Sequence, residues 1–239
     1  MVPSLAAFWF NPKLQNHIAR ATLKGYLFFL THKLLPALQV YSISEISGFN
    51  RYAGAAVYVA DHRGKLDALL LLSILKSAGV LIKSKYGRLP LYRALIKYID
   101  FISVDSDTPQ SLFQAMDRCK ELLKVGKNIV VFPEGTRATS GRMLPFKEFA
   151  FRLAADTGVP VIPVIVHSDY PFMAKLPGSI FPKNKLHYTI RCLEAYYPVD
   201  EERPASFAAR LRVRMAEELK ILDKGTVWER SRDDPCPMQ

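Results

Sequence analysis

From residue 55 onward, short apolar runs alternate with segments in which apolar residues recur at helical spacing. An uninterrupted apolar run is typical of a strand in a parallel sheet, because helices cover both faces of such a sheet. The predicted strands cover residues 55–60, 80–82, 101–104, 129–132 and 161–166. We therefore expect an α/β fold with a mostly parallel central sheet flanked by helices.

The segments between these strands predict helices. Their expected ranges are 67–77, a segment beginning at Pro90, 109–126, 147–156 and 204–222. Pro109 suits a first helical turn, and Gly126 and Gly158 suit the residue that follows a helix. The last helix is amphipathic, so we expect it to close the fold with its apolar side buried.

Two further segments modify the simple pattern. Pro160 and Pro163 interrupt the strand at 161–166, which favours an edge position or a bulge because proline lacks a donor for the ladder. Residues 186–192 alternate between apolar and polar side chains. This alternation predicts a strand with one more polar face, which could run antiparallel to the others.

The beginning of the chain is basic and aromatic, with no acidic residue before Glu45. No apolar run there reaches the roughly 18 residues that a membrane-spanning helix needs. We interpret residues 1–50 as amphipathic helices in a membrane interface, where aromatic and basic side chains suit the depth of the headgroups. A targeting peptide, or helices packed on the domain's own core, are the alternatives.

The 239 residues suit one catalytic domain, which we place at residues 51–225, followed by a polar tail at 226–239 that is a candidate for disorder. Three widely spaced cysteines indicate neither a disulfide framework nor a zinc site. The net charge of +11 favours an anionic partner, namely nucleic acid, an acidic membrane surface or a phosphorylated substrate. No aromatic RNA-binding motif or zinc finger is visible, so we expect no nucleic acid partner.

His62 and Asp67 directly follow the first predicted strand. Five residues turn a straight helix by about 500 degrees, so the pair can meet only if His62 precedes the helix and Asp67 lies in its first turn. Asp67 would then fix the tautomer of the imidazole, and the other ring nitrogen could take a proton from a hydroxyl. The alternatives are that Asp67 is a helix cap and that His62 is an ordinary loop residue.

A second polar segment, Phe132 to Arg137, follows another predicted strand. Open α/β sheets bind ligands beyond the carboxyl ends of their strands. Gly135 allows close backbone approach, Thr136 offers a hydroxyl, and Arg137 can grip a phosphate, whereas Glu134 would orient Arg137 or bind a substrate hydroxyl. A surface turn with a local ion pair is the alternative.

These segments resemble the glycerolipid acyltransferase family, which includes lysophosphatidic acid and glycerol-3-phosphate acyltransferases. His62 and Asp67 match the family's H-x-x-x-x-D motif, and residues 132–137 match its F-P-E-G-T-R block. Residues 145–147 and 159–164 are similar to two further blocks, Pro-Phe-Lys and V-P-x-x-P-V, in the same order. We therefore identify the chain as a suspected member of this family.

The resemblance implies that His62 is the general base, Asp67 its orienting partner, and Glu134, Gly135, Thr136 and Arg137 the acceptor site. It implies direct transfer of an acyl group from acyl-CoA or acyl carrier protein to the free hydroxyl of 1-acylglycerol 3-phosphate, with no metal and no cofactor beyond this co-substrate. Lys85 resembles a lysine of the family's second motif and could supply positive charge. The bland alternative is a solvated surface lysine.

Three departures concern the acceptor. The family commonly has arginine where this chain has Ser106, and glycine where it has Phe149; Gly64 also departs from the first motif of some glycerophosphate acyltransferases. They keep a second acceptor open, such as another lysophospholipid, a lyso-ornithine lipid or glycerol 3-phosphate. We expect the protein to work at a membrane surface on its cytoplasmic face.

Two other classes compete with this hypothesis. Asp105-Ser106-Asp107 is similar to the nucleophile loop of haloacid-dehalogenase-like phosphatases, although the position of Thr108 departs from it and a helix start is the simpler interpretation. The net charge also permits a non-catalytic module that binds membranes or nucleic acid.

Overall fold

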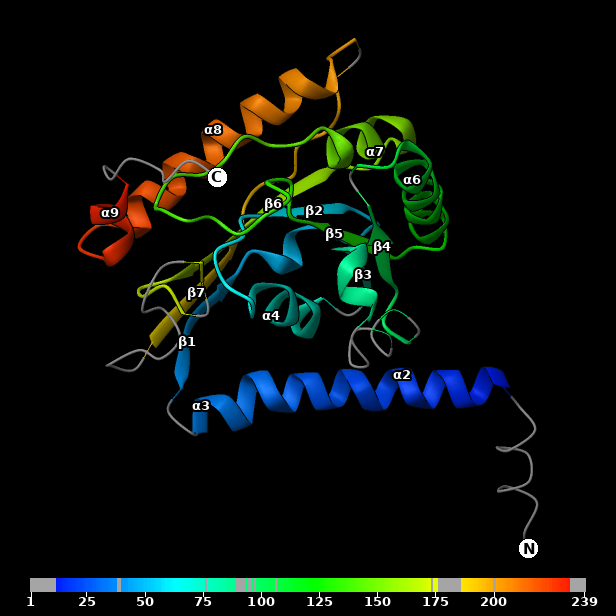
Figure 1. Cartoon of the computed structure of the whole chain (residues 1–239), viewed down its shortest axis with the longest axis horizontal. Helices are drawn as coiled ribbons and strands as arrows, with labels where there is room; N and C mark the ends of the chain where they lie inside the picture. Colours follow the sequence, from blue (N-terminus) through cyan, green and yellow to red (C-terminus); the bar gives the residue numbers. More distant parts are fainter. Residues whose placement is uncertain are drawn as a thin grey trace, which may run out of the picture.

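The computed structural model describes residues 12–37, 40–75, 77–88, 93, 96, 98–105, 107–172, 174–175, 186–199 and 201–232. In this part of the chain, a seven-stranded sheet has the order β1-β7-β6-β2-β5-β3-β4. The strands are β1 (Tyr41–Ser47), β2 (Val57–Ala60), β3 (Ala78–Lys83), β4 (Phe101–Val104), β5 (Asn128–Val131), β6 (Val161–Ser168) and β7 (Leu186–Cys192). Strands β2 to β6 pair in parallel, and β7 is antiparallel to β6 (Figure 1).

The predicted α/β class and mostly parallel sheet are confirmed, as is the antiparallel strand over 186–192. Strand β1 was not predicted, because its sequence Tyr-Ser-Ile-Ser-Glu-Ile-Ser is short and mostly polar. It pairs in parallel with β7 at the edge of the sheet, with a register shift between Ile43 and Glu45. The sheet therefore begins within the segment that the sequence assigns to the N-terminal helices.

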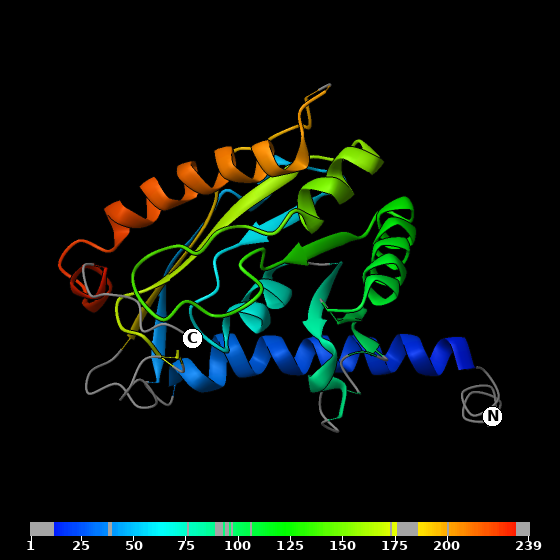
Figure 2. The ribbon, with the colours of Figure 1, turned by 45° about the horizontal axis from the view of Figure 1, so that its top comes forward.

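The helices fill both faces of the sheet. They are α2 (Pro12–Phe29), η1 (Leu30–Leu34), α3 (Leu35–Ala37), α4 (Asp67–Ile74), α6 (Pro109–Lys124), α7 (Phe149–Thr157), α8 (Pro204–Leu222) and α9 (Val227–Ser231), with 3-10 turns η2 (Phe49–Arg51) and η3 (Ser84–Arg88). The helix expected to begin at Pro90 falls largely outside the described residues. Figure 2 shows α2 and α8 on opposite sides of the sheet.

Side chains of one strand alternate between two cores, as the pleat requires. Tyr58 and Ala60 of β2 lie in the core beneath α4, which also receives Leu27 of α2. Val57 and Val59 of the same strand lie in the core beneath α6, α7 and α8. Because both faces are covered, β2 is buried along its whole length, which explains its uninterrupted apolar sequence.

Strand β6 corrects the expectation drawn from Pro163. The strand is not at an edge: it lies between β2 and β7. Val164 pairs with Cys192, but Val161 pairs with Tyr196, so the partner segment carries an extra residue opposite Pro163. The bulge therefore lies in the segment after β7 and not in β6, and it opens the ladder where proline has no N–H to donate.

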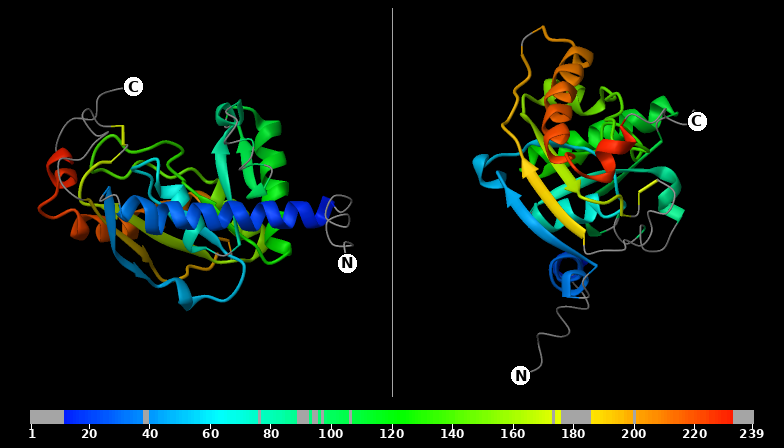
Figure 3. Two further views of the ribbon diagram at one scale, coloured as in Figure 1. Left: turned by 90° about the horizontal axis from the view of Figure 1, so that it is seen from below. Right: turned by 90° about the vertical axis from the view of Figure 1, so that its left-hand side faces the viewer.

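The N-terminal helix packs along the layer that contains α4 (Figure 3). Leu27 and Thr31 are buried, and the Tyr41 hydroxyl donates to the Thr31 carbonyl. The outer side keeps exposed apolar residues, namely Leu14, Ile18, Tyr26, Phe28, Phe29 and Leu34. Of the described helices, none is long and apolar enough to cross a bilayer. This helix thus contributes to the core with one side and leaves an apolar strip on the other.

The expected disorder after residue 225 is wrong for the described residues 226–232. Helix α9 is capped by the Thr226 hydroxyl, which accepts from the Trp228 N–H. Trp228 is fully buried, and its indole donates to the Ser168 carbonyl at 2.9 Å. The segment is mostly polar, so its composition suggests disorder, but one buried tryptophan is enough to anchor it to the domain.

Gly158 ends α7 in the left-handed conformation, with φ of 68°. A Cβ added there would meet no heavy atom within 4 Å, so only backbone conformation opposes a side chain. We expect Gly158→Ala to lower the free energy of unfolding by about 1–2 kcal/mol. Gly158→Asn should lose less, because asparagine tolerates this conformation. Denaturant unfolding measures both, and an alanine variant as stable as the parent would contradict the conformational argument.

Candidate active site

The polar side chains that the sequence singles out lie at one edge of the sheet. Strands β2, β3, β4, β5 and β6 are parallel, so their carboxyl ends meet there. His62 follows β2, Arg137 follows β5, Lys85 follows β3, and Lys175 follows β6. Residues from all these segments line one cavity of about 290 Å³. The site is thus placed by the topology of the sheet.

His62 and Asp67 form the predicted pair. The His62 Nδ1 atom lies 2.9 Å from the Asp67 Oδ2 atom. Asp67 is the first residue of α4, and His62 lies in the turn before it, as the spacing predicts. The carboxylate is buried, whereas the side chain of His62 is 22% exposed. Because Asp67 occupies Nδ1, Nε2 is the nitrogen left for a ligand in the cavity that His62 lines.

Asp67 also shapes the turn that carries His62. Its Oδ2 atom accepts the backbone N–H groups of Arg63 and Gly64, each at 2.8 Å. A Cβ on Gly64 would lie 2.9 Å from the Phe172 carbonyl oxygen, so this position has no room for a side chain. One carboxylate therefore holds both the backbone and the imidazole. The capping alternative is wrong, because Asp67 follows the cap position Leu66 and its carboxylate accepts N–H groups that precede the helix.

Glu134 lies behind the cavity and does not line it. Its Oε1 atom accepts the His62 N–H at 3.2 Å, and its Oε2 atom accepts the Leu144 N–H at 2.8 Å. Burial raises the pKa of Glu134, while these two backbone N–H groups and Arg63 lower it. Both carboxylate oxygens are engaged by the protein. The expected contact with a substrate hydroxyl is therefore not the arrangement seen here.

The other residues of the F-P-E-G-T-R block line the cavity. Gly135 has φ of 67°. A Cβ added to it would lie 3.0 Å from the Cε atom of Lys147, which lines the same cavity. The Thr136 hydroxyl accepts from the Lys175 ammonium group at 2.6 Å. Arg137 faces the same space. Gly135, Thr136 and Arg137 are thus brought together with His62, as predicted.

The wall of the cavity divides by chemistry. Its charged side chains are all cationic in the described residues: Lys65, Lys83, Lys85, Arg137, Lys147 and Lys175. Its apolar side chains come from α4, β3, β4, α6 and the start of α7, and include Leu69, Val80, Phe101, Leu112 and Phe149. Such a wall accommodates an anionic group beside a hydrocarbon chain.

Sequence reasoning found some of these cations and missed others. Lys85 lines the cavity on the exposed turn η3, with its ammonium group 5.7 Å from the centre of the Tyr86 ring. Lys175 was missed because it lies outside the recognised blocks. Burial lowers the pKa of Lys175, and the nearby Arg137, Lys83 and Lys85 lower it further. Its neighbours along the chain give no signal, because the position of β6 within the sheet decides where Lys175 lies.

The segment around Asp105 forms the start of α6. Asp105 N–H donates to the Ser111 hydroxyl at 2.8 Å, and Asp105 Oδ1 accepts the Asp107 N–H at 3.1 Å. Neither carboxylate lines the cavity. The helix start is therefore the correct interpretation of this segment, and the phosphatase loop is not supported.

Comparisons with known proteins show the family of this chain. The sequence profile of the Acyltransferase family matches residues 40–167, more than half of the chain. The chain belongs to this family. It is 34% identical over 137 residues to a chloroplastic 1-acyl-sn-glycerol-3-phosphate acyltransferase of Brassica napus, a match that covers 55% of this chain and 40% of the relative.

Other members of the acyltransferase family give similar matches. The alpha form of 1-acyl-sn-glycerol-3-phosphate acyltransferase from Mus musculus is 33% identical over 157 residues, covering 59% of this chain and 52% of the relative. The chain spans about a third to a half of the length of the curated relatives that it matches first. The family assignment made from the sequence motifs is confirmed.

A solved acyltransferase structure has the same fold. The crystal structure of PlsC from Thermotoga maritima, described as a 1-acyl-sn-glycerophosphate acyltransferase, aligns with a TM-score of 0.68. The alignment covers 90% of this chain and 86% of that chain at 22% sequence identity. At this identity the likeness concerns the fold.

The arrangement around Glu134 predicts a loss of stability on removing its charge. In Glu134→Gln, the amide supplies one acceptor oxygen for two backbone N–H groups, and its own NH₂ group faces a donor. We expect the free energy of unfolding to fall by about 1–3 kcal/mol. Glu121→Gln on the exposed side of α6 is the control and should change stability by less than about 0.5 kcal/mol. Equal losses in denaturant unfolding would contradict the assigned hydrogen bonds.

Proposed function

We propose that this protein transfers a fatty acyl group from an acyl thioester to the free hydroxyl of 1-acylglycerol 3-phosphate. The proposal depends on one observation above all: a histidine–carboxylate pair opens onto a cavity with a cationic part and an apolar part. An acceptor of this kind has a hydroxyl, a phosphate and an acyl chain. The names of the curated relatives support the same reaction.

His62 is the general base in this proposal. Its Nε2 atom takes the proton of the acceptor hydroxyl while the hydroxyl oxygen attacks the thioester carbonyl. Asp67, on Nδ1, stabilises the imidazolium that forms. When the tetrahedral intermediate collapses, the C–S bond breaks and the departing thiolate takes the proton back from His62. No covalent acyl-enzyme is needed, because the thioester is already activated.

The cations around Arg137 hold the phosphate of the acceptor. Arg137 offers a planar fork of donors, and Lys85, Lys147 and Lys175 add point charges on the same wall. Gly135 and Thr136 keep the backbone close to this group. Glu134 is a positioning residue, because its carboxylate holds the His62 backbone from the loop after the neighbouring strand β5. The donor is acyl-CoA or acyl carrier protein.

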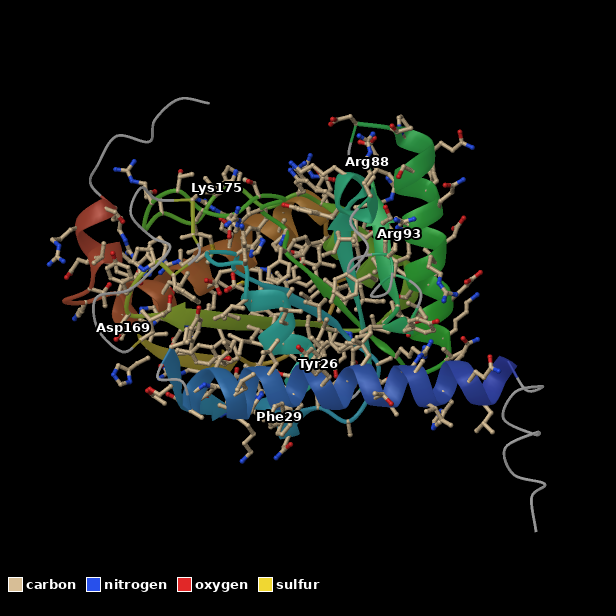
Figure 4. The ribbon with its side chains drawn as sticks, turned by 60° about the horizontal axis from the view of Figure 1, so that its bottom comes forward. Tyr26, Phe29, Arg88, Arg93, Asp169 and Lys175 are labelled. Atoms are coloured by element: carbon tan, nitrogen blue, oxygen red, sulfur yellow. The ribbon has the colours of Figure 1, made fainter. Side chains whose placement is uncertain are left out.

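We also propose that the protein works on a membrane surface, at its cytoplasmic face. Tyr26 and Phe29 lie exposed on α2 (Figure 4). Together with the other exposed apolar residues of this helix, they form a strip that suits the interface between headgroups and acyl chains. Lysolipid acceptors partition into the same layer, so this placement keeps the protein where its substrate is concentrated.

The direct test is an acyl-transfer assay that uses both thioester donors against a panel of acceptors. Lysophosphatidate, lysophospholipids with larger headgroups, a lyso-ornithine lipid and glycerol 3-phosphate compete in one reaction. We expect lysophosphatidate to be preferred, because the cationic wall favours an uncovered phosphate. A strong preference for another acceptor would replace the proposed substrate and keep the reaction.

His62→Ala tests the general base. Loss of a positioned base lowers the rate by about 10²–10⁴-fold. The matched control is His187→Ala, which removes a histidine whose ring contacts Ser42 on β1, at the far side of the sheet. Steady-state rates of both purified variants give the comparison. An active His62→Ala protein would remove the assigned base.

Lys175→Met tests the phosphate grip outside the recognised motifs. We expect the KM for lysophosphatidate to rise about tenfold, since a lost charge-assisted hydrogen bond costs on the order of 1–2 kcal/mol. The KM for monoacylglycerol, which lacks a phosphate, should not change. Lys220→Met on the exposed side of α8 is the control. A rise in the KM for the thioester donor alone would assign Lys175 to the donor instead.

A further inference from the structure

Arg63, the residue after the proposed base, points away from the cavity into the protein. It is 3% exposed. Its Nη1 and Nη2 atoms donate to the two oxygens of Asp223 at 2.7 Å and 2.9 Å, and Nη2 lies 3.3 Å from the Gly141 carbonyl oxygen. This is a bidentate pair in which both partners are buried. Asp223 immediately follows α8, so the pair joins the first motif to the segment between α8 and α9.

Trp228 of α9 covers a face of the same guanidinium, whose edge binds Asp223. The central carbon of the group lies 4.5 Å from the centre of the indole ring. Trp228 is itself held by its hydrogen bond to Ser168, at the end of β6. Arg63 is thus enclosed between a carboxylate and an aromatic face, both supplied by residues 223–228.

The same C-terminal segment holds the loop that follows the F-P-E-G-T-R block. Gly141 N–H donates to the Ser231 hydroxyl at 3.0 Å, and a Cβ on Gly141 would collide with the Trp228 carbonyl. Earlier in this loop, Ala138 N–H donates to the His62 carbonyl at 2.7 Å. The C-terminal segment therefore contacts the His62 turn directly through Arg63 and indirectly through this loop.

We propose that Arg63 is a positioning residue for His62, and that residues 223–232 complete the active site by clamping its guanidinium between Asp223 and Trp228. This proposal rests on the proposed function, because it assumes that His62 is the base. It extends the functional unit past residue 167, where the family match ends. Arg63 does not touch the cavity and acts through the turn that it shares with His62.

Geometry explains how the clamp affects the base. The backbone N–H of Arg63 donates to Asp67, the carboxylate that also holds the His62 ring. Displacing Arg63 moves this N–H and the adjoining His62 together. A misplacement of about 1 Å in a reacting group can cost on the order of 100-fold in rate. Substrate binding depends on cations from other segments, so its loss should be smaller.

Charge gives a second effect. Arg63 faces several buried acids, since its Nε atom lies 3.8 Å from Asp61 Oδ2. Burial raises the pKa of Asp61 well above its usual range and also raises that of Glu134, and the charge of Arg63 partly offsets both shifts. Glu134 is otherwise surrounded by the His62 and Leu144 N–H groups, the His62 ring and the Asp61 carboxyl. Burial already raises the pKa of Glu134. Removing Arg63 should raise it further, so that Glu134 becomes protonated at a higher pH and holds His62 less well.

The expected sign follows from this protonation. Glu134 must be ionised to accept both backbone N–H groups, and His62 must be unprotonated to act as the proposed base, so the acid limb of the pH–rate profile belongs to the two groups together. Loss of the Arg63 cation favours the protonated form of both groups, which moves this limb to higher pH. A residue that only supports the fold would lower thermal stability without moving this limb.

The experiment compares Arg63→Met, Arg63→Lys and Asp223→Asn with a control, Arg191→Met. Arg191 is also a salt-bridged arginine, paired with Glu45 and Glu218 at the other end of the sheet. Thermal unfolding by circular dichroism is measured first, and kinetics follow at a temperature where each variant is folded. Asp223→Asn preserves the shape of the clamp and removes its negative charge, so this variant tests the proposal if Arg63→Met does not fold.

We expect kcat to fall by about 10- to 100-fold in Arg63→Met and Asp223→Asn, with the KM of either substrate changing less than about threefold. Arg63→Met should also move the acid limb upward, and Arg63→Lys, which keeps the charge, should restore the limb but not the full kcat. Arg191→Met should lose stability and keep kcat and the acid limb.

A folded Arg63→Met or Asp223→Asn protein with parental kcat would overturn the clamp, as would an equal loss of kcat in Arg191→Met. An unmoved acid limb in Arg63→Met would also overturn it. Failure of the proposed function is distinguishable, because the parent protein itself would then transfer no acyl group to any acceptor.

Discussion

The turn from Asp61 to Asp67 depends on backbone N–H groups that donate to buried carboxylates. Asp67 accepts two of them from within the turn, and Glu134, in the loop after the neighbouring strand β5, accepts the N–H of His62. An ionised carboxylate that accepts several N–H groups is stabilised despite burial, and the donors are fixed in return. The position of the imidazole is therefore set by hydrogen bonds to its own main chain as much as by its partner Asp67.

The parallel sheet explains why residues far apart in the chain reach this turn. Strands β2 and β5 are hydrogen-bonded neighbours, so the segments after them leave the sheet side by side. The tight contact between Glu134 and His62 is a direct consequence of this register, in which Val59 lies opposite Val131. Strand β6, on the other side of β2, delivers Ser168 and His167 toward Asp223 and Trp228. The same edge thus builds both the cavity and the buried support beneath it.

Much of this arrangement was accessible from the sequence, and the reasons are local. Apolar runs located β2 to β6 because parallel strands are buried on both faces, and Pro109 and Gly126 marked the ends of α6. The His62–Asp67 contact followed from helical geometry over five residues. The role of Glu134 could not be predicted, because the sequence does not distinguish an acidic loop residue that faces the substrate from one that accepts backbone N–H groups. The roles of Lys175, Asp223 and Trp228 could not be predicted either, because only the tertiary structure brings these residues close to the turn.

The buried carboxyl groups and the cavity cations lie on opposite sides of the turn. On its inner side lie Asp61, Asp67, Glu134 and Asp223, all buried, with Arg63 as a cation among them. Burial raises the pKa of Asp61 well above its usual range. Burial by itself would raise the pKa of Asp223, but the His167 ring 3.3 Å away and the hydrogen bonds from Arg63 lower it to about 2, so this carboxylate is ionised at neutral pH.

On its outer side, the charged residues that line the cavity are cations in the part of the chain that the structure describes. His62 lies at the boundary between these two regions. In the proposed reaction this position favours both the acceptor and the base. The outer cations attract the phosphate of the acceptor, and the ionised inner carboxylates stabilise the imidazolium that forms when the acceptor hydroxyl loses its proton to His62. A base placed wholly among the cations would gain the first effect and lose the second.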